Sequence, residues 1–84
     1  MHTVYVLKSL KDNKLYIGCT SNLQKRLIDH SRGNVKSTES RRPFQLIFKE
    51  EFLDKYRAFG KERYYKTPKG KKELKEKINH CGVV

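Results

Sequence analysis

The chain has 84 residues, of which 20 are lysine or arginine and 9 are aspartate or glutamate, so its formal net charge is +11. This length allows one domain with a small core and excludes dinucleotide-binding folds, barrels and two-domain enzymes. The charge points to a polyanionic partner such as DNA, RNA or an acidic membrane surface. The five tyrosines and four phenylalanines argue against disorder, because they can build a core.

Nothing in the sequence predicts a membrane segment or an export signal. The longest apolar run, Val4–Leu7, is far shorter than the roughly 20 residues that span a bilayer, and no apolar segment typical of signal peptides follows the first residue. The two cysteines, Cys19 and Cys81, do not form a disulfide framework, and their spacing from His30 and His80 matches no zinc finger. We therefore expect a cytoplasmic protein in which Cys19 is a small buried residue.

The first two predicted elements form a β-hairpin. Residues Thr3–Leu7 are rich in β-branched and aromatic side chains and predict a strand, and Leu15–Cys19 predicts a second one. The polar residues 11–14 between them predict the turn. Near the end of the second strand, Gly18 indicates a place where the backbone bends or approaches another group closely.

A helix is expected after the hairpin. Ser21 and Gln24 have the spacing of a capping box, and Gly33 is placed to end the helix in a left-handed conformation. Arg26 and His30 are four residues apart and therefore share a face. The buried stripe is expected from three apolar residues, namely Leu23, Leu27 and Ile28.

A third strand and a second helix follow a polar loop over residues 34–43. Phe44–Phe48 begins the strand, which extends toward Phe52. Asp54 is placed to cap a helix over Lys55–Lys66. One face of this helix carries Ala58, Glu62 and either Tyr65 or Lys66.

The last helix begins at Pro68, with Thr67 as its cap and with Leu74 and Ile78 as its apolar stripe. The order of elements is therefore β-β-α-β-α-α. It predicts a single α+β domain over residues 1–84, in which helices flank a three-stranded antiparallel or mixed sheet.

The basic residues are densest over residues 22–43, where six lysines and arginines accompany two acidic residues. Charges that bind a nucleic-acid backbone act through phosphate contacts. We therefore expect the first helix and the loop after it to contact phosphates.

Cleavage of a phosphodiester needs more than basic charge, because groups must also activate water and stabilise the charge that develops on the phosphate. Two hairpin tyrosines can lie close together if they face the same side of the sheet. An arginine and a histidine follow on the next helix, and a glutamate follows on a later one. The candidate catalytic set is Tyr5, Tyr16, Arg26, His30 and Glu62.

Landmarks of a known family occur in order along the chain. The hairpin contains Thr3-Val4-Tyr5 and Tyr16-Ile17-Gly18, and Arg26, His30 and the pair Ala58 and Glu62 come later. In this order and spacing they resemble the GIY-YIG endonuclease superfamily, in particular its small stand-alone members. Residues 36–38 and 41–43 resemble the loop before the third strand of that family, and the resemblance covers roughly residues 3 to 78.

The resemblance implies a metal-dependent hydrolytic mechanism. One divalent cation, Mg²⁺ or Mn²⁺, would be held by Glu62 together with waters and a phosphate oxygen. Tyr5 would act as general base or orient the attacking water, and a base role would need nearby positive charge to favour the phenolate. Arg26 would stabilise the charge on the phosphate. Tyr16 would position these groups, and His30 would be a second base or a phosphate contact.

The expected partner is DNA, single- or double-stranded, with RNA left open, and the expected process is DNA repair, recombination or processing. We expect a monomer or a weak homodimer and no membrane partner. Contacts to the nucleic-acid backbone are expected from Lys25, Arg32, Lys36, Ser37, Thr38, Arg41, Arg42 and Lys66.

Two other functions fit the same composition. The first is a nucleic-acid-binding module without useful catalysis, which would bind in a salt-dependent way and cut nothing. The second is a small structural protein associated with RNA, in which Tyr5 and Tyr16 would be core residues lying away from Arg26 and Glu62.

Overall fold

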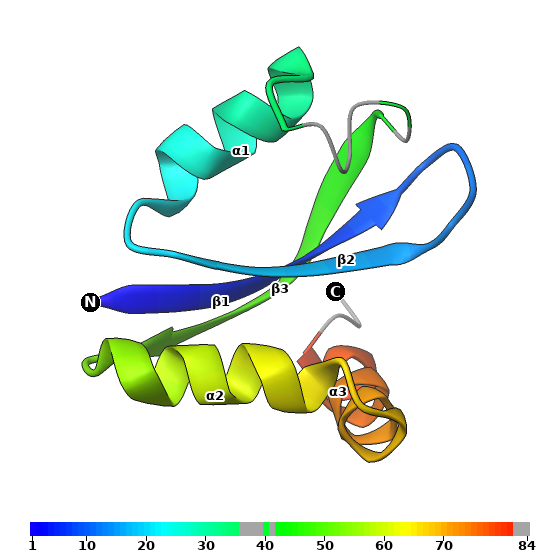
Figure 1. Ribbon diagram of the computed structural model, residues 1–84. Helices are drawn as coiled ribbons and strands as arrows, with labels where there is room; N and C mark the ends of the chain where they lie inside the picture. The colour runs from blue at the N-terminus through cyan, green and yellow to red at the C-terminus, as the bar shows by residue number, and fades with distance from the viewer. Residues whose placement is uncertain (36–39, 41, 82–84) are drawn as a thin grey trace.

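The computed structural model describes residues 1–35, 40 and 42–81 of the chain. Three strands and three helices follow one another in the predicted order β-β-α-β-α-α, which confirms the α+β class (Figure 1). The elements are β1 (His2–Ser9), β2 (Leu15–Thr20), α1 (Leu23–Arg32), β3 (Phe44–Phe52), α2 (Lys55–Tyr65) and α3 (Pro68–Cys81).

The three strands form one antiparallel sheet in the order β2-β1-β3, so the first strand of the chain lies in the middle. Tyr5 at the centre of β1 pairs with Gly18 of β2 on one side and with Lys49 of β3 on the other. Because side chains alternate along a strand, β1 supplies both faces of the sheet. Val4 and Val6 point to one face, and Tyr5 points to the other.

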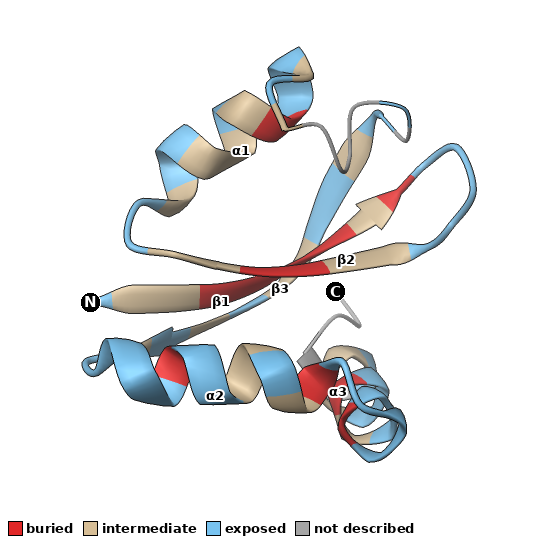
Figure 2. Ribbon diagram, viewed as in Figure 1, coloured by how far each residue is buried: buried red, intermediate tan, exposed pale blue. Residues whose placement is uncertain are grey.

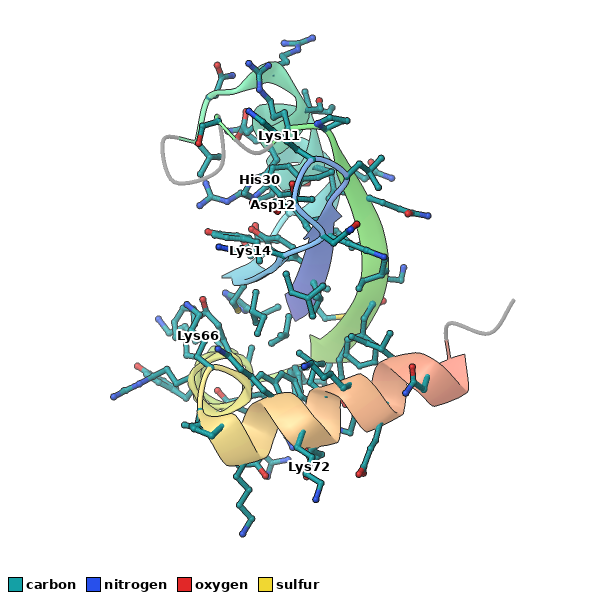
Figure 3. All side chains as sticks on the ribbon, turned by 90° about the vertical axis from the view of Figure 1, so that its right-hand side faces the viewer. Lys11, Asp12, Lys14, His30, Lys66 and Lys72 are labelled. Atoms are coloured by element: carbon teal, nitrogen blue, oxygen red, sulfur yellow. The ribbon has the colours of Figure 1, made fainter. Side chains whose placement is uncertain are left out.

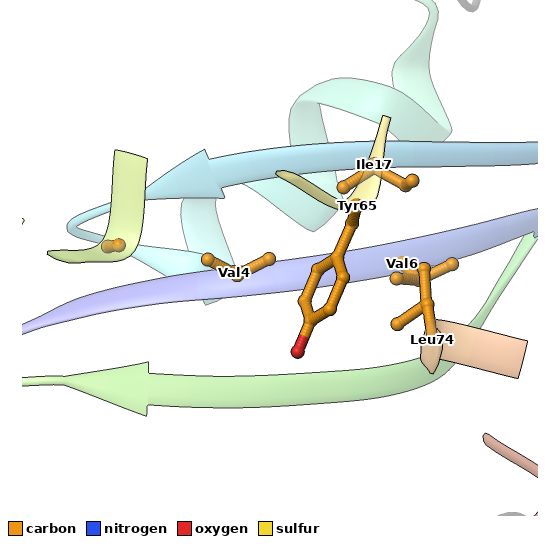
Figure 4. Close-up of a cluster of buried hydrophobic side chains, with 6 residues drawn as sticks. Val4, Val6, Ile17, Tyr65 and Leu74 are labelled. Atoms are coloured by element: carbon orange, nitrogen blue, oxygen red, sulfur yellow. The ribbon is translucent and has the colours of Figure 1, made fainter. Parts of the chain in front are cut away.

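The helices lie on opposite faces of the sheet, with α1 on one side and α2 and α3 on the other (Figure 1). The apolar core lies between the sheet and the α2–α3 pair, and buried residues gather on β1 and on the inner sides of these helices (Figure 2). It is built from Val4, Val6, Ile17, Ala58, Tyr65 and Leu74 (Figure 4). The second and third helices therefore carry most of the hydrophobic stabilisation of the domain.

Side-chain caps fix the helix starts largely as the sequence predicts. The Asp54 carboxylate accepts a hydrogen bond from the Tyr56 backbone N–H at 2.8 Å, and the Thr67 hydroxyl accepts one from the Gly70 N–H at 3.0 Å. The predicted Ser21 cap is wrong: Asn22 caps α1 by accepting from the Lys25 N–H at 3.1 Å. The Thr20 hydroxyl accepts a bond from the Asn22 N–H, and this local turn places Asn22 at the start of the helix.

The buried face of α1 also differs from the prediction. Ile28 is 49% exposed, whereas His30 is only 1% exposed and is the fully buried residue of this helix. Leu23 and Leu27 are half-buried, so the inner stripe runs from Leu23 through Leu27 to His30. A hydrogen bond between His30 and Tyr5 makes the burial of this polar ring favourable.

Cys19 is half-buried against the core rather than fully buried. Across the part of the chain that the structure describes, no helix combines the length and the apolar character needed to cross a membrane.

We expect the substitution Tyr65→Phe to lower the free energy of unfolding by about 1–2 kcal/mol. The Tyr65 hydroxyl donates to Glu50 Oε1 at 2.8 Å and accepts from Lys77 Nζ at 2.9 Å, and its ring is fully buried. Urea denaturation measures the loss. Tyr64→Phe is the matched control, because the Tyr64 hydroxyl meets Glu73 only at 3.4 Å and its removal should cost less than about 0.5 kcal/mol. Equal losses in the two variants would contradict this account.

Candidate active site

The Tyr5 ring lies directly over Gly18. A Cβ placed at Gly18 would be 2.5 Å from both the Cζ atom and the hydroxyl oxygen of Tyr5. The close approach that the sequence predicts at Gly18 is therefore the approach of this ring. Only a glycine leaves room for the ring across β2, and it lets a fully buried tyrosine hold one fixed position.

An aromatic cluster surrounds Tyr5 between the sheet and α1. The Tyr5 hydroxyl is hydrogen-bonded to His30 Nε2 at 3.0 Å. The centroid of the half-buried Tyr16 ring is 5.1 Å from that of His30 and 6.4 Å from that of Tyr5. Phe44 of β3 lies edge-on to His30 at 6.0 Å between ring centroids. These rings fix the position and direction of the Tyr5 hydroxyl.

Arg26 lies beside the Tyr5 phenol, on the face of α1 that it shares with His30. A hydrogen bond to the Tyr5 side chain raises the pKa of Arg26, so the guanidinium stays charged. Its Nε–H is buried and has no acceptor among the described residues. Arg26 therefore combines a fixed position with unused hydrogen-bonding capacity, which suits a group that binds an anion.

The environment of Tyr5 favours the protonated phenol. Burial raises the pKa of Tyr5 above its usual 10.0, and Tyr16 and Glu62 add to the rise, whereas Arg26 opposes it without cancelling it. The phenolate that a general base requires is therefore not favoured by the residues of the chain alone. The base role of Tyr5 would therefore need further positive charge near the phenol, and both predicted roles of Tyr5 stay predictions.

Glu62 lies on α2, on the opposite side of the sheet from α1 (Figure 1). Its charge raises the pKa of Tyr5, and it adds to the effect of burial in raising the pKa of Cys19 on β2. The Lys66 ammonium donates a hydrogen bond to Glu62 Oε2 at 3.2 Å. Glu62 and Tyr5 belong to different layers, because Glu62 is on α2 and Tyr5 points to the face of the sheet that α1 covers.

The carboxylate of Glu62 suits a hard divalent cation that keeps most of its waters. Among the described residues, no group of three or more His, Cys, Asp or Glu side chains is placed to hold a metal. A single carboxylate is instead what Mg²⁺ uses when it keeps several waters and binds substrate phosphates. Glu62 fits this pattern, because its carboxylate is half-buried and its partner is the exposed Lys66 ammonium.

His30 is buried, and its Nε2 is hydrogen-bonded to the Tyr5 hydroxyl at 3.0 Å. Figure 3 shows His30 on the α1 side of the sheet, whereas Lys66, the partner of Glu62, lies on the side of α2 and α3. Holding the Tyr5 hydroxyl is the role that this position supports.

Stability is expected to fall in mild acid because of His30. Burial lowers the pKa of His30 below its usual 6.5, the Arg26 charge lowers it further, and Asp29 opposes both effects. The unfolded chain therefore binds a proton more readily, and stability is lost as the pH falls from 6.5 through the lower folded-state pKa. Thermal unfolding at about pH 7.5 and about pH 5 measures this loss. The drop in Tm should be smaller in His30→Gln, and an unchanged drop would assign the effect to other groups.

The predicted backbone contacts are spread over the molecule. Lys25 and Arg32 are exposed on α1, and Arg42 is exposed while donating to the Ser31 carbonyl at 3.4 Å. Lys66 is exposed and paired with Glu62. Four further predicted contacts lie outside the described residues, namely Lys36, Ser37, Thr38 and Arg41.

Two residues near the cluster were not among the sequence-predicted set. Asp29 acts electrostatically on both Arg26 and His30, and Phe44 packs on the His30 ring. The position of Asp29, three residues after Arg26, was a usable signal for a shared helix surface. No signal in the sequence points to Phe44, since its contact depends on how β3 pairs with β1.

Comparison with known proteins places this geometry in a family. The family model described as the GIY-YIG catalytic domain matches residues 1–79. A UPF0213 protein of Staphylococcus saprophyticus, SSP2268, is 40% identical over 75 residues, which cover 88% of this chain and 90% of that protein. The UPF0213 protein YazA of Bacillus subtilis is 45% identical over 75 residues, covering 87% of this chain and 75% of the relative.

A solved structure agrees with this assignment. The solution NMR structure of the UPF0213 protein BH0048 from Bacillus halodurans superposes with a TM-score of 0.58 at 30% identity. The match covers 98% of this chain and 86% of that one. The resemblance carried by Tyr5, Tyr16, Arg26 and Glu62 is thus confirmed at the level of the whole chain. The chain belongs to the GIY-YIG family of nuclease domains and is a relative of the UPF0213 proteins.

Proposed function

We propose that the protein is a metal-dependent endonuclease that hydrolyses phosphodiester bonds in DNA during repair, recombination or processing. One observation carries the proposal: the buried Tyr5 hydroxyl is hydrogen-bonded to His30 and lies beside Arg26, whose buried Nε–H has no acceptor among the described residues. A packed core would not need a charged guanidinium beside one buried phenol. This placement also argues against a structural role for the tyrosines.

The roles of the residues follow from their environments. Arg26 binds the phosphate, because its charge is permanent and its buried Nε–H has no acceptor among the described residues. Tyr5 orients the attacking water with its hydroxyl, and His30 fixes the direction of that hydroxyl. Tyr16 packs against both rings and keeps them in place.

Glu62 would hold one Mg²⁺ or Mn²⁺ ion. When bound, such a cation polarises the phosphate and stabilises the leaving oxygen. Lys66 pairs with the same carboxylate, so this ammonium must share or release Glu62 when a cation binds.

A cleavage assay on labelled single- and double-stranded DNA and RNA tests the proposal. We expect product with Mg²⁺ or Mn²⁺, none with EDTA, and a loss of about 100-fold or more in Tyr5→Phe, which removes the water-orienting hydroxyl. Tyr56→Phe removes an exposed hydroxyl and keeps the aromatic ring, so it is the matched control and should cleave normally. Salt-dependent binding without product under any metal would instead support a binding module without catalysis.

A further inference from the structure

Gly60 lies in the middle of α2, where a glycine weakens a helix. No neighbouring heavy atom lies within 4 Å of the point where its Cβ would be, so nothing in the described fold requires a glycine there. Gly70 of α3 is different, because a Cβ at that position would collide with the Tyr64 carbonyl oxygen. A glycine that packing does not explain is expected where another molecule approaches the backbone closely.

Gly60 belongs to an exposed stripe along α2. Tyr56, Phe59, Gly60 and Arg63 have the spacing of neighbours on one side of a helix, and all four are exposed. We call these four residues the α2 outer face. Tyr56 is 72% exposed and Phe59 is 43% exposed, which is unusual for aromatic side chains in a domain whose core is small. One edge of Phe59 packs against the His2 ring at 6.0 Å between centroids, and the exposed remainder of the two rings is aromatic area that the fold does not cover.

Positive charge surrounds this aromatic area. The Lys55 ammonium lies 5.3 Å from the centroid of the Tyr56 ring, and Arg63 is exposed on the same stripe. Glu62 follows Phe59 by three residues, so the α2 outer face begins one helical turn from the proposed cleavage site.

A surface hollow adjoins Gly60 on the other side of the stripe. It measures about 620 Å³ and is lined by Phe52, Arg57, Gly60, Lys61, Tyr64 and Glu73. Glu73 lies 3.7 Å from the Lys61 ammonium and 3.8 Å from the Lys77 ammonium, so its charge is compensated. The hollow is deepened by the missing side chain at Gly60 and combines aromatic walls with cations.

We propose that the α2 outer face binds an unpaired segment of a nucleic-acid strand, with bases stacked on Tyr56 and Phe59 and the backbone passing over Gly60. The inference rests on the proposed function, because the strand would be the one presented to the cleavage site. Stacking on aromatic side chains requires exposed base faces, which an intact duplex keeps inside. A second copy of this chain is disfavoured as the occupant, because each copy carries a net charge of +11.

Binding of labelled oligonucleotides in EDTA tests the stacking. The probes are an oligothymidine single strand and a duplex of equal length, and fluorescence anisotropy gives the affinities. The double substitution Tyr56→Leu and Phe59→Leu keeps apolar area and removes the aromatic faces. We expect it to lower single-strand affinity by about tenfold or more and duplex affinity by less than about twofold.

A second pair of variants separates backbone contact from stacking. Arg63→Gln should weaken both probes and reduce the slope of log affinity against log salt by about 0.7–0.9. Lys72→Gln is the matched control, since Lys72 is exposed on α3 and points away from α2 (Figure 3), and it should leave both affinities nearly unchanged.

Gly60→Gln tests the close approach directly. A glutamine favours the helix and fills the hollow, so the Tm should rise by a few degrees while single-strand affinity falls by about threefold or more. Unchanged affinity in this variant, equal losses on single strand and duplex in the leucine variant, or a dimer that the leucine variant dissociates would each overturn the proposal.

The binding assay distinguishes this inference from the proposed function. If the expected affinity pattern appears but no metal supports cleavage, the α2 outer face is a binding surface and the hydrolytic function is wrong. If cleavage occurs and the affinity pattern does not, the stacking surface is wrong and the active site stands.

Discussion

Glu62→Gln is expected to lower DNA cleavage by about 1,000-fold or more while the domain stays folded. Glutamine has nearly the shape of glutamate and can still accept the hydrogen bond from Lys66. It lacks the charge that holds a hard divalent cation, and one carboxylate is the whole acidic contribution to the site that we propose. Removal of the cation takes away several kcal/mol of charge stabilisation at the phosphate.

Single-turnover cleavage at saturating Mg²⁺ measures the loss, and partial recovery at high Mn²⁺ would place the defect in cation binding. Glu73→Gln is the matched control. Glu73 is a half-buried glutamate of α3 that pairs with Lys61 of α2 and with Lys77 of α3, and its loss should cost less than about 1 kcal/mol of stability and leave cleavage intact. A Glu62→Gln protein that cleaves within about tenfold of the wild type would remove Glu62 from the mechanism.

The second large effect is expected from Gly18→Ala, which adds a single methyl group. The new Cβ would lie 2.5 Å from the hydroxyl oxygen of Tyr5, whose side chain is fully buried. Overpacking of this kind costs about 1–3 kcal/mol, and the displaced hydroxyl loses its bond to His30. Both stability and cleavage should fall, and cleavage should fall by about 100-fold because a shift of about 1 Å at a reacting group is enough.

Urea denaturation and the cleavage assay measure the two effects in the same protein. Gly60→Ala is the comparison for stability, because no neighbouring heavy atom lies within 4 Å of the position of its Cβ. That variant should gain about 0.5–1 kcal/mol. The account fails if Gly18→Ala unfolds at the same urea concentration as the wild type and retains its activity.

Much of the fold was predictable because its signals are local. The hairpin, the Gly33 end of α1, the Asp54 cap and the Pro68 start of α3 each depend on a few neighbouring residues. The strand order and direction were harder to predict, because the sequence is compatible with either an antiparallel or a mixed sheet and does not indicate that β1 lies at the centre. Pairing of β1 with β3 is a contact between distant segments.

The composition of the site was predictable, whereas its environment was not. The order and spacing of the motifs predict Tyr5, Arg26 and Glu62, and the structure places Arg26 beside Tyr5. The sequence says nothing about how deeply Tyr5 is buried, and burial is what raises its pKa. The sequence likewise predicts Ile28 on the inner face of α1, where the structure has His30. A buried histidine depends on a hydrogen-bond partner from another element, and the sequence of the helix does not show that partner.

The burial of His30 has a consequence for how α1 is attached to the sheet. His30 is the fully buried residue of that helix, and its partner is the Tyr5 hydroxyl. The groups proposed to orient water and phosphate are therefore also the contacts that dock the helix. A substrate that binds Arg26 would stabilise the packing of α1 on the sheet, and a substitution at Tyr5 or His30 would weaken it. Local opening of α1 and occupancy of the site are in this way thermodynamically linked, so evolution can adjust one only by adjusting the other.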